Sequence, residues 1–207
     1  MQQKEHWEKV YQTKSIDAVS WFQEHALRSL QLIRQTGVLS SAPIIDVGGG
    51  ASTLVDDLLS DGYSNLTILD LSSSAIAAAK NRLGSDRSKK VKWMVANILE
   101  VDLGADTYEV WHDRAVFHFL TEREERQNYI QKALKVVTPG GFIIIATFAE
   151  DGPIQCSGLP AVRYSADQLQ AEFGDSFALI QHEKESHRTP SGSIQQFMYC
   201  RFQKLTS

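Results

Sequence analysis

The chain contains the stretch Ile44-Ile45-Asp46-Val47-Gly48-Gly49-Gly50-Ala51-Ser52, and Asp70 ends another apolar run twenty residues after Gly50. An apolar strand that enters Asp-x-Gly-x-Gly and then a helical segment makes a tight turn. The backbone there can press against a ligand, because glycine has no Cβ. An acidic residue at the end of the next strand is placed to accept hydrogen bonds from ribose hydroxyls. These two features predict an adenosine-containing cofactor across the strand ends.

The glycine turn departs from the G-x-G-x-x-G fingerprint of nicotinamide-binding proteins. Gly48 and Gly50 fit it, but Thr53 stands where the third glycine would be. Asp46 can instead accept hydrogen bonds around the turn and from the ammonium group of a ligand. The segment resembles motif I of the class I S-adenosylmethionine (SAM) methyltransferases, and a glycine turn in an unrelated α/β protein is the alternative. The resemblance implies SAM as cofactor, bound by Asp46, Gly48, Gly49, Gly50, Asp70, Leu71, Asn97, Ile98 and Asp113.

Composition bounds the class of protein. The chain has 207 residues, 43% of them hydrophobic, and a net charge of −4, which suits one domain with an ample core. No Lys/Arg-rich stripe is present, so we expect no nucleic-acid partner. Cys156 and Cys200 cannot form a disulfide framework, and no apolar run is long enough for a signal peptide or a membrane span. We expect a cytoplasmic protein, a monomer or homodimer, without a membrane partner or a metal site.

Strands and helices alternate after residue 40, which predicts an α/β fold with a parallel sheet and helices on both faces. Right-handed crossovers would make the sheet doubly wound. The last two strands follow without a helix between them, which predicts an antiparallel C-terminal edge strand. The resemblance to the methyltransferases implies a Rossmann-like sheet of seven strands. We expect strands at 43–47, 65–69, 91–95, 108–112, 142–147, 177–184 and 194–202, and helices at 53–60, 73–82, 122–136 and 166–173.

The first 40 residues precede this pattern and carry several large aromatic side chains. Trp7 and Tyr11 lie in an expected helix at 5–11, and Trp21-Phe22 precede another at 25–36. Aromatic residues of this size are usually buried in cores or under lids. We therefore divide the chain into an N-terminal helical lid, residues 1–40, and a SAM-binding domain, residues 41–207. In this region the chain is similar to uncharacterised bacterial methyltransferases and to the lysine methyltransferases of elongation factor and citrate synthase.

Two loops at the carboxyl edge of the expected sheet carry polar side chains. Asn97 follows the third strand, where the family usually has an acid that accepts from the adenine amino group; the alternative is an asparagine that fixes a turn. His118 follows the fourth strand and is either a general base or a histidine packed between Phe117 and Phe119. The Asn-Pro-Pro-Tyr motif of amide and base N-methyltransferases is absent here, which argues against glutamine or nucleobase acceptors.

The loop after the fifth strand lies at the same edge, where loops carry function. Arg163 could clamp an anionic substrate, and Tyr164 could donate a proton or form an aromatic wall. Cys156 could be a reactive thiol. For each of the three, an ordinary surface-loop residue is the alternative. We take His118, Arg163 and Tyr164 as the candidate catalytic residues.

The resemblance implies transfer of a methyl group to an S, N or O nucleophile. A small-molecule acceptor is the first candidate, because the chain adds no large recognition domain. A protein lysine is the alternative acceptor. A non-catalytic module that binds SAM or a nucleotide is the alternative from another class, and the intact Gly48, Gly50 and Asp70 disfavour it.

Overall fold

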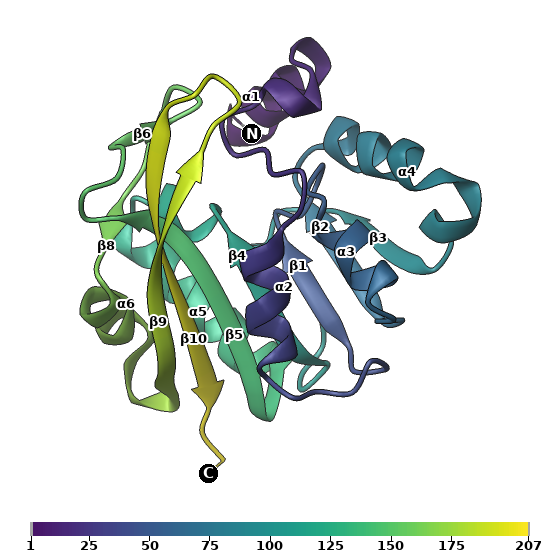
Figure 1. Cartoon of the computed structure of the whole chain (residues 1–207). Coiled ribbons are helices and arrows are strands. Elements are labelled where there is room, and N and C mark those ends of the chain that lie inside the picture. Colours follow the sequence, from purple (N-terminus) through teal and green to yellow (C-terminus); the bar gives the residue numbers. More distant parts are fainter. Residues whose placement is uncertain (1, 207) are drawn as a thin grey trace.

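The computed structural model describes residues 2–206 and folds them into one α/β layer structure (Figure 1). The main sheet has the strand order β3-β2-β1-β4-β5-β10-β9, and a short strand, β8, pairs with β5. The strands are β1 (Ile44–Val47), β2 (Leu66–Asp70), β3 (Val91–Val95), β4 (Tyr108–Arg114), β5 (Val137–Ala149), β8 (Arg163–Tyr164), β9 (Phe177–Arg188) and β10 (Ile194–Lys204).

The strand order reverses direction at β1. β1 pairs in parallel with β2 on one side and with β4 on the other, so that Ile45 stands between Thr67 and Trp111. In open parallel sheets, ligands bind at such a switch point, outside the carboxyl ends of the strands. The glycine turn that follows β1 therefore lies at the position where ligands bind in sheets of this kind.

Helices cover both faces of the sheet, and the strand sequences show why. In β5, Ile143 and Ile145 belong to one hydrophobic cluster and Ile144 to the other, because alternate side chains point to opposite faces. One face packs on α5 (Arg123–Val136) and α6 (Ala166–Phe173), and the other on α2 (Leu27–Arg34), α3 (Leu54–Ser60) and α4 (Ser73–Ser88). The remaining helices are α1 (Gln2–Thr13) and the short η1 (Ile16–Ala18), η2 (Phe117–Phe119) and η3 (Gly174–Ser176).

The expected fold class is confirmed, with local differences. The antiparallel strand β10 lies between β5 and β9, one strand in from the edge. α4 begins after a side-chain cap, in which Ser72 Oγ accepts from the amide of Ala75 at 3.1 Å. The helix continues past its expected end at residue 82 to Ser88, across Gly84, whose φ of 75° breaks the helical geometry.

The segment expected as a loop after β5 contains a small hairpin of β6 (Gln155–Cys156) and β7 (Leu159–Pro160) before β8. Cys156 and Cys200 are buried free thiols. In residues 2–206, no helix has the length and apolar character that crossing a membrane requires. Within the same range, no three His, Cys, Asp or Glu side chains gather as a metal ion would require.

Candidate active site

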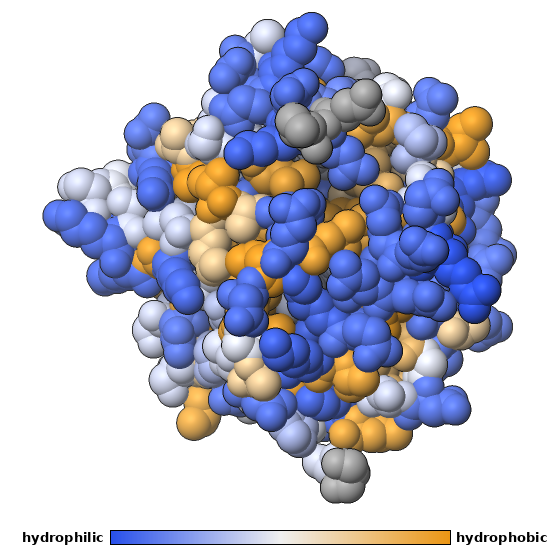
Figure 2. Space-filling model, turned by 180° about the vertical axis from the view of Figure 1, so that it is seen from behind, coloured by the Kyte–Doolittle hydropathy of each residue, from blue (hydrophilic) through white to orange (hydrophobic). Residues whose placement is uncertain are grey.

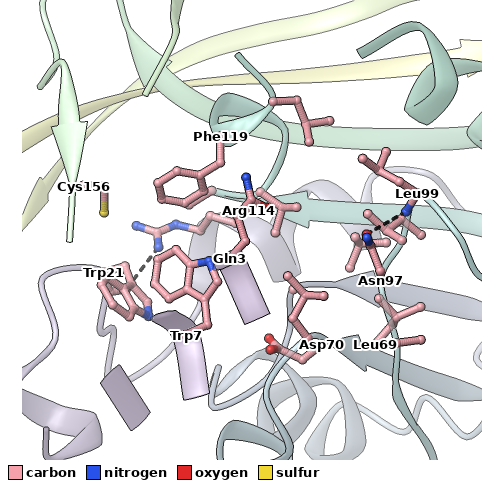
Figure 3. A pocket seen from close by; sticks show the side chains of 18 of the residues that line it. Gln3, Trp7, Trp21, Leu69, Asp70, Asn97, Leu99, Arg114, Phe119 and Cys156 are labelled. Carbon is pink, nitrogen blue, oxygen red and sulfur yellow. Dashed lines mark hydrogen bonds between the residues drawn. The ribbon is translucent and has the colours of Figure 1, made fainter. Parts of the chain in front are cut away.

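A cavity lies at the carboxyl ends of β1, β2 and β4 and under the N-terminal segment (Figure 3). Trp21 and Cys156 mark one end of it, Asn97 and Leu99 mark the other, and Asp70 lies between them. A second cavity adjoins it at Gly48, Tyr11, Trp21 and Arg114. The two cavities thus form one continuous recess, in which the first cavity is mainly apolar and the second is more polar.

The glycine turn shapes the floor of this recess. Gly48 has a φ of 71°, and a Cβ at this position would collide with the side chain of Val116. A Cβ on Gly50 would collide with the carboxylate of Asp70 and approach Ala75 to 2.8 Å. Glycine is required at both positions for steric reasons, because it tolerates positive φ and allows close approach. Gly49 lines the second cavity.

Asp70 presents its carboxylate to the first cavity at the end of β2. Its side chain is 7% exposed, and its Oδ1 accepts from the amide of Ser72 at 2.8 Å. Burial raises the pKa of Asp70 to about 7, because a charged carboxylate is poorly solvated there. Hydroxyl donors from a ligand would stabilise the charged form, so this carboxylate could hold a ribose.

Asp46 lines the second cavity, and one of its carboxylate oxygens is buried beside Gly49. Its Oδ1 lies 2.6 Å from His112 Nδ1, and His112 Nε2 lies 2.8 Å from Ser29 Oγ. Both Asp46 and His112 are 3% exposed at the side chain, yet Asp46 Oδ2 has no hydrogen-bond partner among the described residues. An unpaired buried carboxylate oxygen is costly, so a cationic donor from a ligand would stabilise it. An ammonium group could fill this place.

The loop after β3 forms the apolar end of the first cavity. Asn97 lines it, but Asn97 Oδ1 accepts from the amide of Leu99 at 3.0 Å and Asn97 Nδ2 donates to Glu100 at 2.8 Å. Asn97 therefore stabilises the turn, which was the alternative prediction for this residue. Its Oδ1 keeps one lone pair that can accept a hydrogen bond from a ligand. Its apolar neighbours could sandwich an adenine ring; they are Leu69, Leu71, Ala96, Ile98 and Leu99.

Aromatic side chains close the opposite end. The ring of Trp7 packs edge-on against Trp21 at 5.5 Å and against Phe119 at 5.1 Å. Trp21 Nε1 donates to Tyr11 Oη at 3.2 Å. Four rings from α1, the following segment and η2 thus cover the recess, where they could exclude water and face a cationic sulfur.

A carboxylate fastens this cover to the domain. Glu8 of α1 accepts from Ser72 Oγ at 2.8 Å and from the amide and hydroxyl of Ser74 at 3.2 and 2.5 Å. These hydrogen bonds hold the pKa of Glu8 at about 2, well below its ordinary value. Because Ser72 also caps α4 and follows Asp70, the cover is tied directly to the ribose end of the site.

The candidate residue Asp113 lies outside the lining of both cavities. It is fully buried, and its carboxylate accepts from the amides of Val116 and Phe117 at 2.9 and 3.1 Å and from Tyr129 Oη at 2.5 Å. Burial raises its pKa to about 6. Its oxygens are engaged in holding the turn after β4, so the geometry gives it a structural role rather than a place on the cofactor.

His118 is also placed away from the recess. It is fully buried, its Nδ1 accepts from the amide of Phe148 at 3.2 Å, and its ring packs on Phe119 and Phe148. Burial lowers its pKa to about 3, so it is neutral and a weak base. The geometry supports the packed core histidine and does not support a general base.

The other two candidate catalytic residues are not brought to the cavity. Tyr164 is 3% exposed, and its ring packs 5.7 Å from that of Phe117 in the core. Arg163 is exposed, and its Nη1 donates to the carbonyl of Gly152 at 3.5 Å. Neither could clamp a substrate beside Asp70 in this arrangement.

Sequence analysis missed two polar residues that do line the recess, His112 and Arg114. They alternate along β4 with Trp111 and Asp113, and β1 pairs Asp46 directly with His112. Because side chains alternate between the two faces of a strand, His112 and Arg114 lie on the same face of the sheet as Asp46. This two-residue spacing is the sequence feature that could have identified them.

Comparisons with known proteins agree with this geometry. Residues 44–141 match the family model of a methyltransferase domain. In sequence the chain is similar to EEF1A lysine methyltransferase 2 of Danio rerio, with 27% identity over 157 residues that cover 70% of this chain and 67% of the relative.

Two solved structures share the fold. One comes from work on the conversion of a disulfide bond into a thioacetal group during echinomycin biosynthesis. It has a TM-score of 0.78 and 18% identity and covers 98% of this chain and 92% of its own. The other is the Burkholderia thailandensis 1,6-didemethyltoxoflavin-N1-methyltransferase with bound 1,6-didemethyltoxoflavin and S-adenosylhomocysteine. It has a TM-score of 0.68 and 17% identity and covers 99% of this chain and 85% of its own.

Proposed function

We propose that this chain, which is a class I SAM-dependent methyltransferase, methylates a small molecule that it encloses beneath its N-terminal segment. The observation that carries the proposal is the cover itself, in which Trp7, Tyr11 and Trp21 line the recess. A small acceptor fits a closed recess, whereas a lysine on a folded protein needs an open mouth.

The side chains at the recess suit SAM. The ribose would lie at Asp70, the adenine in the apolar slot beside Asn97 and Ile98, and the ammonium group at the unpaired oxygen of Asp46. Gly48 supplies the close backbone approach. These roles rest on placement and charge, and each of them can be tested separately.

Methyl transfer requires little of the protein beyond alignment of the acceptor with the methyl group. SAM supplies a methyl group on a positively charged sulfur; a lone pair of the acceptor forms the new bond to carbon while the carbon–sulfur pair returns to sulfur. The protein holds the acceptor in line and excludes water. Because His118 is buried away from the recess, the proposal assigns it no proton transfer, and an acceptor that arrives deprotonated needs no base.

A second candidate is methylation of a protein lysine, and the similarity to EEF1A lysine methyltransferase 2 favours it. Incubation with SAM labelled in the methyl group and a cell extract divided into small molecules and proteins distinguishes the two. We expect label in the small-molecule fraction. Label confined to protein would contradict the proposal in favour of the second candidate, and heat-denatured protein serves as the control for background labelling.

Figure 2 shows the back face, where apolar side chains gather below the upper end of the molecule amid a mainly hydrophilic surface. The first cavity continues outward at its apolar end into a groove that Lys4, Glu100, Val101 and Glu125 line. The end near Trp21 has the aromatic cover instead. This difference supports a cofactor that enters from the groove side and an acceptor held under the cover.

A further inference from the structure

Among the described residues that line the two cavities, Arg114 is the one arginine or lysine. It ends β4, and its side chain is 10% exposed. Its guanidinium is permanently charged, and a charge buried to this extent is costly unless it is fully paired. The hydrogen-bond partners of its three guanidinium nitrogens therefore indicate the role of Arg114.

Two of the three nitrogens donate hydrogen bonds within the protein, and the third makes only an ion pair. Nε donates to Tyr199 Oη at 2.9 Å, and Nη1 donates to the carbonyl of Trp21 at 3.1 Å, the contact drawn in Figure 3. Nη2 is buried and has no hydrogen-bond partner among the described residues. Nη2 instead forms a long ion pair with Glu185, whose Oε2 lies 3.9 Å away, beyond hydrogen-bond distance.

The topology places this donor on the side of the site away from the two aspartates. Asp46 lies one residue before the end of β1 and Asp70 ends β2, so the features that suit the cofactor lie over that half of the sheet. The guanidinium points the other way, because its partners Tyr199 and Phe197, the latter ring 4.3 Å from it, belong to β10. A group bound at Nη2 would therefore lie away from Asp46 and Asp70, on the side proposed for the acceptor.

We propose that Arg114 holds a negatively charged oxygen, a carboxylate or an ionised hydroxyl, of a small planar acceptor. The rings of Trp7, Trp21 and Phe119, which line the same cavity, suit a flat molecule. A lysine ammonium would instead meet a like charge. This inference rests on the proposed small-molecule function and narrows its acceptor to a chemical class.

The test uses three planar probes of similar size that differ in charge: benzoate, benzamide and benzylammonium. Each is titrated into the whole protein saturated with S-adenosylhomocysteine. We expect benzoate to bind about tenfold more tightly than benzamide, the scale of one charge-assisted hydrogen bond, and benzylammonium to bind least. The Arg114→Gln variant should lose this preference, and the Arg163→Gln variant, which removes an arginine outside the cavity, should keep it.

Several results would overturn the inference. Equal binding of benzoate and benzamide, no binding of benzoate, or a preference for benzylammonium would each do so. So would an Arg114→Gln variant that binds S-adenosylhomocysteine more weakly but 5′-methylthioadenosine equally well, because Arg114 would then hold the carboxylate of the cofactor. The labelling experiment separates this failure from that of the proposed function, since label in neutral small molecules would overturn only the role of Arg114.

Discussion

Replacing Asp70 by Asn should weaken S-adenosylhomocysteine binding and remove most of its dependence on pH. The amide of Ser72 already donates to Asp70 Oδ1 at 2.8 Å, so it would hold the carbonyl oxygen of the new amide. The NH₂ group would then take the place of Oδ2 beside Gly50 and would offer no acceptor to a ribose. Loss of a hydrogen bond to a charged group costs about 1.5–3 kcal/mol, which corresponds to about 10- to 150-fold in Kd.

The pH dependence follows from the direction of the pKa shift. Burial raises the pKa of Asp70 from 3.8 to about 7 in the folded protein, so folding favours its protonated form. The stability that this group contributes is full below pH 4 and is lost as pH rises through about 7. Ribose hydroxyls donate to the ionised form, so the affinity of the wild-type protein for S-adenosylhomocysteine should rise with pH up to about 7 and level off above it.

Isothermal titration calorimetry from pH 5.5 to 8.5 measures both effects. The analogue of S-adenosylhomocysteine without the two ribose hydroxyls is the matched control, and wild type and variant should bind it equally. Asp102→Asn, at an exposed carboxylate outside the site, controls for the change of net charge. A folded Asp70→Asn variant with the affinity and pH profile of the wild type would refute the assignment of Asp70.

Further substitutions test other parts of the account. Gly48→Val should abolish S-adenosylhomocysteine binding, because a Cβ at Gly48 collides with Val116; unchanged affinity in calorimetry would count against the turn. Glu8→Gln should loosen the cover, raise the Kd for S-adenosylhomocysteine about tenfold and speed amide exchange in α1. Because the pKa of Glu8 is lowered to about 2, the protection of α1 in the wild-type protein should decrease as pH falls below 4.5. Equal exchange rates in the two proteins would contradict the role of Glu8 in holding the cover. His118→Gln should leave kcat and its pH profile nearly unchanged, and a large loss of kcat relieved at high pH would restore His118 as a base. NADH should not raise the melting temperature, whereas S-adenosylhomocysteine should; the reverse result in a thermal-shift assay would overturn the choice of cofactor.

Sequence predicted the fold because the decisive signals are local. The strands of the parallel sheet are short apolar runs, and α4 begins at a serine cap, Ser72. The position of β10 between β5 and β9 could not be predicted in the same way, because strand order depends on contacts between segments far apart in the chain. Periodicity assigns a residue to a face of a strand but not a strand to a neighbour.

The site was predictable where backbone geometry determines it and not where packing does. Gly48 and Asp70 lie at the recess because a turn and a strand end put them there. His118 lies in η2, just after the end of β4, yet its ring packs on Phe119 and Phe148 in the core. The place of Arg114 depends on Tyr199, 85 residues later in the chain, which no local pattern indicates.

A crystal structure of the protein with S-adenosylhomocysteine would show directly whether the recess is the cofactor site. We predict the ribose hydroxyls at the carboxylate of Asp70, the ammonium group at Asp46, the adenine beside Ile98, and the sulfur facing the aromatic end beneath Trp7. The recess beyond the sulfur, next to Arg114, should remain large enough for a small molecule. A ligand bound away from Asp70 would contradict the cofactor site, and a sulfur facing an open channel to the surface would contradict the enclosed small-molecule acceptor.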